Sequence, residues 1–214
     1  MEYKIDHIPK NTPNNRRPGF VMTPKYLTIH STGNPSSTAK NERAWLTNPT
    51  NDRTASYHIV VDEKEAIEVL PLNEVAWHAG DGNGQGNRAS IGIEICESGN
   101  RAKTLQNAVK LVTKMLKERN WGVEKLRRHF DWSGKICPRI LQPNNWAGWN
   151  KFKQDVQKEL AGGGIVANKD IPDTWAKKDW DWAKKEGWLD GTRPKDNLTR
   201  QELAIVIRRL VERK

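Results

Sequence analysis

Three residues that can bind a metal ion give the clearest chemical signal in this sequence of 214 residues. His129 and Cys137 lie within the stretch 127–138, which ends at a proline. At their spacing they cannot be neighbours on one helix face, so a glycine-containing loop such as Trp132–Gly134 must turn the cysteine back. Zinc takes tetrahedral nitrogen and sulfur ligands, and a catalytic zinc site has three protein ligands and a water molecule. A third ligand is therefore required, and His30 is the best candidate.

The segment that contains His30 is predicted to be a strand. Residues 26–33 form a short apolar, β-branched run that stops at the turn residues 33–35. The end of a strand holds a side chain rigidly at the edge of a sheet, as a metal site requires. A lone histidine in a strand is more often packed and hydrogen-bonded, so the zinc hypothesis depends on the set of three residues.

Further strands and helices are predicted around these residues. The apolar runs 57–61 and 66–70 indicate a hairpin, and 91–95 is a strand interrupted only by Glu94. A carboxylate inside an apolar strand is costly to bury unless it has a partner or a role. Apolar residues at helical spacing predict helices whose apolar faces pack on the sheet. These helices are expected over 39–48, 104–120 and 149–160.

Three other segments are expected to be irregular. Residues 80–87 hold four glycines and predict a surface loop that contacts substrate. A phosphate-binding loop is excluded there because no strand runs directly into it and no helix follows. Residues 1–24 indicate a polar lead-in without chemistry, with Arg16–Gly19 as a surface loop. Three successive glycines, 162–164, predict a flexible linker over 161–168.

Composition limits the classes of partner. The net charge of +10 favours polyanionic partners: nucleic acid, anionic membranes or the teichoic-acid-bearing wall of Gram-positive bacteria. A charge of this size could equally be only a solvated surface. Scattered basic residues and the lack of helix-turn-helix or zinc-finger spacing argue against nucleic acid. No apolar run is long enough to span a bilayer, and the N-terminus lacks the pattern of a secretory signal. The two cysteines are too few for a disulfide framework, and Cys96 is expected to be a small buried residue.

Five motifs occur in an order that resembles the zinc-dependent N-acetylmuramoyl-L-alanine amidases of the type-2 amidase family, which includes bacteriophage endolysins. The motifs are Thr28–Thr32, Tyr57–Asp62, Ala76–Gly80, Gly92–Ile95 and His129–Pro138. The resemblance covers about residues 20–160. It implies an α/β catalytic domain over 1–160, with a central mixed β-sheet flanked by helices.

The resemblance also implies cleavage of the amide bond between N-acetylmuramic acid and L-alanine. One zinc ion per chain is expected on His30, His129 and Cys137, where it would lower the pKa of a bound water to about 7. Glu94 is the candidate general base. Lys135, two residues before the cysteine, is expected to stabilise the oxyanion.

Four further residues are weighed for the same site. Tyr57 is the third candidate catalytic residue, because some relatives place a tyrosine near the metal. His78 and Trp77 are candidate substrate-binding residues, although His78 could equally be a hydrogen-bonded loop histidine. His58 lies on the strand face opposite Tyr57 and is expected to be packed.

The tail, residues 169–214, resembles a single S-layer homology repeat. It contains two predicted helices: one carries Trp175, Trp182 and Ala183 and ends near Gly187, and the other opens at the capping box Thr199–Glu202. The resemblance implies a small helical module that binds a secondary cell-wall polymer. The alternative is a helical hairpin that packs on its neighbour or on a second copy.

Three functions follow from these observations. The first is a phage or prophage endolysin, made in the host cytoplasm, that reaches peptidoglycan through a holin. It is expected to be a monomer that neither inserts into a membrane nor binds nucleic acid. A cytoplasmic cell-wall recycling amidase would use the same chemistry. The others are a non-catalytic peptidoglycan-binding protein, against which the complete ligand set argues, and a basic nucleic-acid binder with structural zinc, which no motif favours.

Overall fold

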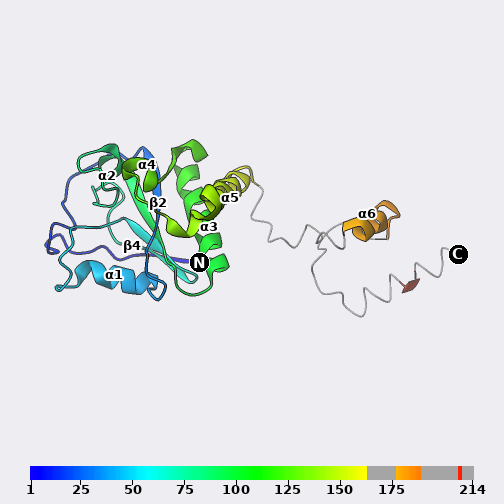
Figure 1. The fold of residues 1–214 in the computed structure, drawn as a ribbon, viewed down its shortest axis with the longest axis horizontal. Coiled ribbons are helices and arrows are strands. Elements are labelled where there is room, and N and C mark those ends of the chain that lie inside the picture. The colour runs from blue at the N-terminus through cyan, green and yellow to red at the C-terminus, as the bar shows by residue number, and fades with distance from the viewer. Residues whose placement is uncertain (163–176, 189–206, 209–214) are drawn as a thin grey trace. The chain divides into compact units, whose positions relative to one another are not determined.

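The computed structural model describes residues 1–162, 177–188 and 207–208 (Figure 1). The chain divides into two compact units, Met1–Gly164 and Ile165–Lys214. In the part of the chain that is described, no helix combines the length and the apolar character needed to cross a membrane.

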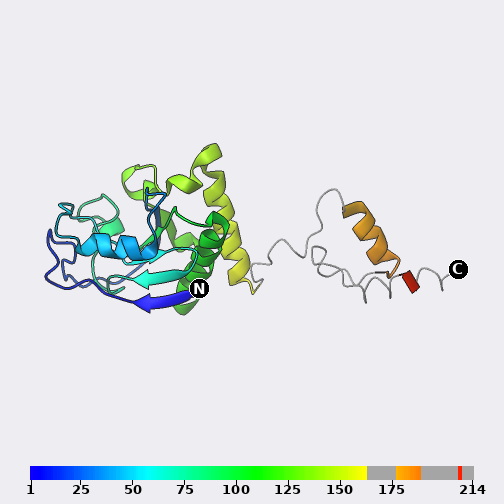
Figure 2. The same cartoon turned by 90° about the horizontal axis from the view of Figure 1, so that it is seen from below.

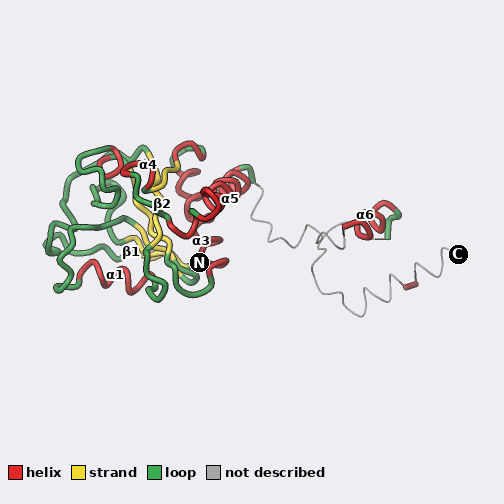
Figure 3. The backbone as a smooth tube through the Cα atoms, in the orientation of Figure 1, coloured by secondary structure: helices red, strands yellow, loops and turns green. Residues whose placement is uncertain are grey.

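A six-stranded sheet forms the centre of the first unit (Figure 3). Its order is β1-β4-β3-β5-β2-β6, and only β3 and β4 pair antiparallel, so the sheet is mixed as predicted. The strands are β1 (Glu2–Ile5), β2 (Tyr26–Ser31), β3 (Ile59–Val61), β4 (Glu65–Glu68), β5 (Ser90–Ile95) and β6 (Leu126–Arg128). The short hairpin β3–β4 lies within the runs 57–61 and 66–70 except for Glu65, which starts β4.

Helices lie on both sides of this sheet (Figure 1). Helix α1 (Ala39–Thr47) contacts β3 and β4, whereas α3 (Arg101–Glu118) contacts β3 and β5 and packs along α5 (Pro143–Leu160; Figure 2). Thr38 and Asn41 form a capping box that starts α1. The short helices are α2 (Gln85–Arg88), α4 (Phe130–Ser133) and two 3₁₀ turns, Val123–Lys125 and Arg139–Leu141. All three predicted helices are confirmed; α5 begins earlier than expected and is kinked at 144–146.

The register of the two central strands divides polar from apolar side chains. His30 pairs with Glu94 and Ile29 with Ile93 between parallel β2 and β5, and residues paired in this way point to the same face. Ile29 and Ile93 are fully buried, and the buried stripe of α3 faces the sheet. The other face has a core beneath α1, where Val60 is packed. His30 and Glu94 share the face of Val60, which Glu94 opposes in β3.

The N-terminal segment is not the polar lead-in that the sequence predicts. Its first residues form β1, which pairs with β4 at the edge of the sheet. Arg16, predicted in a surface loop, is fully buried. Its guanidinium donates to the backbone carbonyls of Leu46, Asn51 and Arg53, which satisfy the donors of a charge that is otherwise costly to bury. This arginine therefore holds the end of α1 and the loop after it.

The glycine-rich segment 80–87 also differs from its prediction. Helix α2 starts inside it, at Gln85, so the expectation that no helix follows the loop was wrong. The Asp81 carboxylate accepts hydrogen bonds from the backbone N–H groups of Gly86 and Asn87. Asn87 itself is buried. The side chains of Asp81 and Asn87 accept hydrogen bonds from backbone N–H groups that no helix or strand pairing satisfies. The spacing of apolar residues in the sequence does not reveal such contacts.

Helix α6 (Lys177–Lys185) belongs to the second unit. Gly187 follows it with φ +71°, and the Trp188 N–H donates to the Ala183 carbonyl, so this helix ends where predicted. Trp175 lies outside the described residues, and so does the predicted helix opened by Thr199–Glu202 apart from Ile207 and Arg208.

Candidate metal centre

His30 lies on an interior strand of the sheet. Strand β2 pairs with β5 on one side and β6 on the other, and the His30 side chain is 1% exposed. The strand continues one residue beyond it, to Ser31, before the turn at Gly33 (φ +69°). The predicted rigid placement at the end of a strand is confirmed.

The other two candidate ligands come from the segment after β6. His129 follows that strand directly and immediately precedes α4. Gly134 ends α4 in the left-handed region, at φ +75°, which a residue with a side chain rarely adopts. The Phe130 N–H then donates to the Cys137 carbonyl, closing the loop. The chain turns back at the predicted glycine, but Trp132 and Ser133 belong to the helix rather than to the loop.

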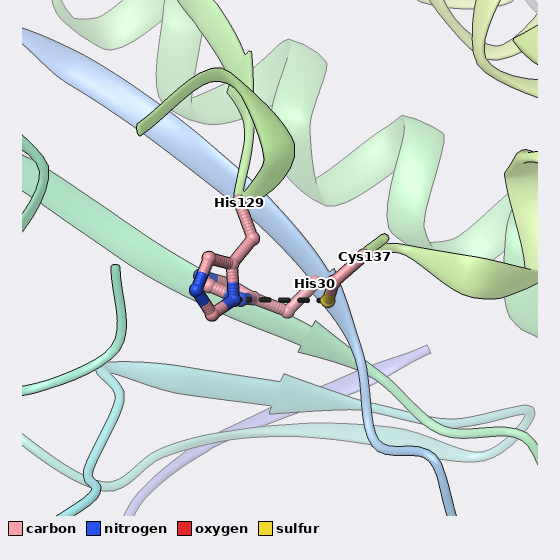
Figure 4. Close-up of side chains that lie close together, drawn as sticks. All are labelled: His30, His129 and Cys137. Carbon is pink, nitrogen blue, oxygen red and sulfur yellow. Dashed lines mark hydrogen bonds between the residues drawn. The ribbon is translucent and has the colours of Figure 1, made fainter. Parts of the chain in front are cut away.

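The three side chains converge (Figure 4). One ligand atom from each of His30, His129 and Cys137 lies within 4.8 Å of the others. The His30 and His129 Nδ1 atoms are 3.1 Å apart, and Cys137 Sγ is 3.7 Å from His30 Nδ1. Tetrahedral zinc with ordinary bond lengths separates two nitrogens by about 3.3 Å and a nitrogen from a sulfur by about 3.6 Å. The donor set and the spacing therefore fit a zinc ion.

Burial keeps these ligands uncharged when no metal is bound. It lowers the pKa of His30 well below the ordinary value, with a further contribution from His78, and that of His129 to about 4. Burial raises the pKa of the Cys137 thiol to about 12, and the carboxylate of Glu94 adds to this effect. Neutral imidazoles are ready to bind a metal, and a bound cation would reverse the effect on the thiol and favour the thiolate.

Glu94 lies beside this cluster. Its Oε1 is 4.0 Å from His30 Nδ1, and its side chain is 16% exposed. Its Oε2 is a buried atom without a hydrogen-bond partner among the described residues. Burial and the charge of Glu42 raise the pKa of Glu94 to about 8, while Lys135 opposes the shift. Such a carboxyl group has a pKa near that of an effective general base.

A cleft of about 1000 Å³ joins the cluster to the surface. Its lining includes the three candidate ligands, Glu94 and every other predicted site residue: Lys135, Tyr57, Trp77 and His78. The remaining wall comes largely from α1 and the loop after it, with Asn41, Trp45 and Arg53 among its residues. The cleft is large enough for a sugar or peptide segment.

These four residues differ in how they are held. Lys135 is exposed. The Tyr57 hydroxyl donates to the Glu42 carbonyl at 2.8 Å, and burial raises its pKa well above the ordinary value. Trp77 donates from Nε1 to the Asn15 carbonyl. His78 is buried, with both ring nitrogens within hydrogen-bond distance of other groups. The roles assigned to these residues stay predictions.

Two supporting residues were missed in the sequence. The Asn87 side chain accepts from the backbone N–H groups of His78 and Ala79, both at 2.8 Å. At Gly92, an added Cβ would lie 2.7 Å from Cγ of His78, so only glycine leaves room for the ring. An asparagine after a glycine-rich run and a glycine in a strand are weak signals of burial and of close approach.

Comparison with known proteins identifies close relatives. The family described as N-acetylmuramoyl-L-alanine amidase (Amidase_2) matches residues 20–140. The N-acetylmuramoyl-L-alanine amidase XlyA of Bacillus subtilis (strain 168) is 45% identical over 163 residues, which are 74% of this chain and 51% of that protein. The chain spans about half the length of the first curated relatives that it matches.

Solved structures match the first unit closely. The structure of the catalytic domain of XlyA is 45% identical, with a TM-score of 0.66, and the match covers 72% of this chain and 98% of that one. A structure described as a mutant endolysin from Bacillus subtilis has the same identity and TM-score and is covered to 99%, with 73% of this chain matched. These chains share the mixed sheet flanked by helices.

Proposed function

Since the chain belongs to the N-acetylmuramoyl-L-alanine amidase family, we propose that it hydrolyses the amide bond between N-acetylmuramic acid and L-alanine in bacterial peptidoglycan. The observation that carries this proposal is the convergence of His30, His129 and Cys137 in a cleft that also contains Glu94 and Lys135. Three protein ligands leave a fourth coordination position, as in catalytic rather than structural zinc sites.

We infer that the metal is one zinc ion per chain. Two imidazoles and a thiolate are a donor set that suits zinc, and their spacing agrees with tetrahedral coordination. When bound, zinc would supply Lewis-acid chemistry that activates a water molecule near neutral pH. The Nδ1 atoms of His30 and His129 and the Cys137 thiolate would hold it.

Glu94 would then transfer the proton, and Lys135 would stabilise the negative charge. Glu94 takes the proton of the attacking water and passes it to the leaving amine, since its carboxylate lies beside the ligand cluster and is mostly buried. Lys135 lines the same cleft and donates a hydrogen bond to the carbonyl oxygen as negative charge develops there. Tyr57 is the alternative proton donor, but it would have to leave its bond to Glu42.

The bond specificity has a direct test. The purified protein is incubated with zinc and peptidoglycan, and new L-alanine amino termini and new sugar reducing ends are both quantified. An amidase releases amino termini only. Reducing ends without new amino termini would exclude the proposed reaction, and peptidoglycan binding without either product would support the non-catalytic alternative.

We propose that the biological role is that of an endolysin. A solved relative described as an endolysin supports this role. Intact cell walls should then be good substrates, and added protein should lyse Gram-positive cells from outside. A recycling amidase would instead cleave soluble peptidoglycan fragments and leave intact walls largely unchanged, so a comparison of the two substrates separates the alternatives.

Residues 169–214, joined through 161–168 to the catalytic domain 1–160, are proposed to bind a secondary cell-wall polymer. The basis is the resemblance to one S-layer homology repeat. The full chain should bind walls more tightly before the polymer is chemically extracted than after. Equal binding would favour the helical-hairpin alternative. Sedimentation of the full chain tests the expectation that the protein is a monomer.

A further inference from the structure

His78 lies behind the metal cluster rather than in it. Its Nδ1 is 3.0 Å from Nε2 of His30, on the side of that ring away from Cys137, and its Nε2 is 3.2 Å from the Ser90 carbonyl oxygen. The ring is buried against Gly92, and the edge of the His58 ring packs on it. Each nitrogen of His78 therefore has one defined partner.

These contacts determine which ring nitrogen carries the hydrogen in His78 and, as a result, in His30. A carbonyl oxygen can only accept, so Nε2 of neutral His78 carries the hydrogen and Nδ1 is left as an acceptor. Nε2 of His30 must then donate to that acceptor. A neutral imidazole carries one hydrogen, so Nδ1 of His30 is left with a lone pair. That lone pair points toward Cys137 and His129.

His129 lies on the other side of His30. Its Nδ1 is 3.1 Å from Nδ1 of His30, and its Nε2 lies beside Gly80. In the metal-free chain, the lone pair on Nδ1 of His30 can accept from Nδ1–H of His129. A bound cation would take the place of that hydrogen.

We propose that His78 is a positioning residue that sets the Nε2–H tautomer of His30 and so presents the Nδ1 atom of this ligand to the metal. This inference rests on the proposed zinc site, and it assigns His78 to the support of His30 rather than to substrate. Groups of this kind, behind metal ligands, change metal affinity by about 10- to 100-fold when they are removed.

The tautomers are measured first, in the metal-free full chain. Long-range ¹H–¹⁵N spectra near pH 7.5 distinguish a protonated Nε2 from a protonated Nδ1 in each histidine. We expect protonated Nε2 and unprotonated Nδ1 for His30 and His78. A predominant Nδ1–H form of His30 would overturn the proposal. This measurement needs no metal, so its outcome is separate from that of the proposed function.

Substitutions at position 78 provide the second test. His78→Leu removes the acceptor, and we expect zinc affinity, measured by competition with a chelator, to fall about 10- to 100-fold. His78→Asn places an amide oxygen near the position of Nδ1, so it should recover much of that loss. His7→Asn is the matched control, because His7 pairs with Glu68 outside the site and should leave zinc affinity unchanged.

The remaining outcomes also decide the question. If His78→Leu binds zinc as tightly as the parent, or if His78→Asn binds no better than His78→Leu while both fold, the proposal fails although the zinc site stands. If the leucine variant does not fold, the parent tautomers and the asparagine variant decide. Absence of zinc binding by the parent chain would count against the proposed function, and the tautomer spectra would still decide the positioning of His30.

Discussion

The ligand pair, His30 and His129, and the support pair, His58 and His78, are buried in the same unit but differ in their hydrogen bonds. In the ligand pair, Nδ1 faces the other ring and the cysteine. In the support pair, both nitrogens have partners behind the site: His58 contacts the Gly92 N–H and the Glu74 carbonyl, and His78 contacts His30 and the Ser90 carbonyl. Residue type and burial therefore do not decide which histidines can bind a metal; the hydrogen bonds of each ring do.

The largest effect is expected from removing a ligand. In Cys137→Ser, a soft thiolate is replaced by a hydroxyl group that binds zinc weakly. Because complete zinc sites contribute about 10 kcal/mol, loss of one ligand should weaken zinc binding by about 10³-fold or more. Metal analysis and wall lysis should both show the loss.

Cys96→Ala is the matched control for that substitution. Cys96 is the other free, buried cysteine and packs in the core beneath α1. Its variant should keep about one zinc per chain and its lysis. If Cys137→Ser retained zinc and lysis, the ligand pair would be structural and the contrast between the two pairs would disappear.

The next effect separates chemistry from metal binding. In Glu94→Gln the carboxylate is lost but none of the three ligands changes, so kcat should fall about 10²- to 10⁴-fold. Zinc content should stay at one per chain. Parallel measurement of turnover and bound metal checks this result; a variant that lost its zinc as well would place Glu94 among the groups that hold the metal.

Asn87→Ala tests how the loop that carries His78 is held in place. The substitution leaves the buried N–H groups of His78 and Ala79 without acceptors, at a cost of about 1–3 kcal/mol each. Urea unfolding of the metal-free chain should show a loss of about 2–6 kcal/mol in the free energy of unfolding. Asn83→Ala, at a side chain that only contacts Arg88, should change stability little. Equal stability of the two variants would mean that the loop rearranges.

The smallest predicted effect is a pH dependence of stability. Burial lowers the pKa of His58 to about 4 from the ordinary 6.5, so the unfolded chain binds more protons between these values. The contribution of His58 is therefore complete at neutral and higher pH and is lost as pH falls; between pH 7 and pH 5 it amounts to about 2 kcal/mol.

His58→Gln should flatten that part of the pH dependence. Unfolding of the metal-free parent and variant is compared at pH 7 and pH 5. An unchanged slope in His58→Gln would show that other histidines of the two pairs account for the effect.

The sequence predicted the ligand pair better than the support pair. His30, His129 and Cys137 could be proposed because zinc ligands belong to few residue types and because a strand end and a glycine turn are local signals. The mixed sheet and its main helices followed from periodicity and from the family resemblance. His58 was expected to be packed and is fully buried, which confirms that prediction. The supporting role of the pair could not be assigned, since most of its partners are backbone carbonyls and N–H groups, which nearly every residue carries.

Two of the wrong predictions have the same cause, which is hydrogen bonding between polar side chains and the backbone. Arg16 was expected at the surface because charged residues are rarely buried, but carbonyls at the end of α1 accept its donors. Residues 80–87 were expected to be only a loop because glycine disfavours regular structure, but Asp81 and Asn87 hold them in place. In both segments, hydrogen bonds between side chains and the backbone outweigh local propensity.

The contact between Gly92 and His78 has a consequence for evolution. The ring of His78 occupies the space that a side chain at position 92 would need. A lineage that acquired alanine at position 92 would have to accept a smaller residue at position 78 or shift the loop that carries it. These two positions, on different elements and far apart in the gene, should therefore change together or not at all as related chains diverge.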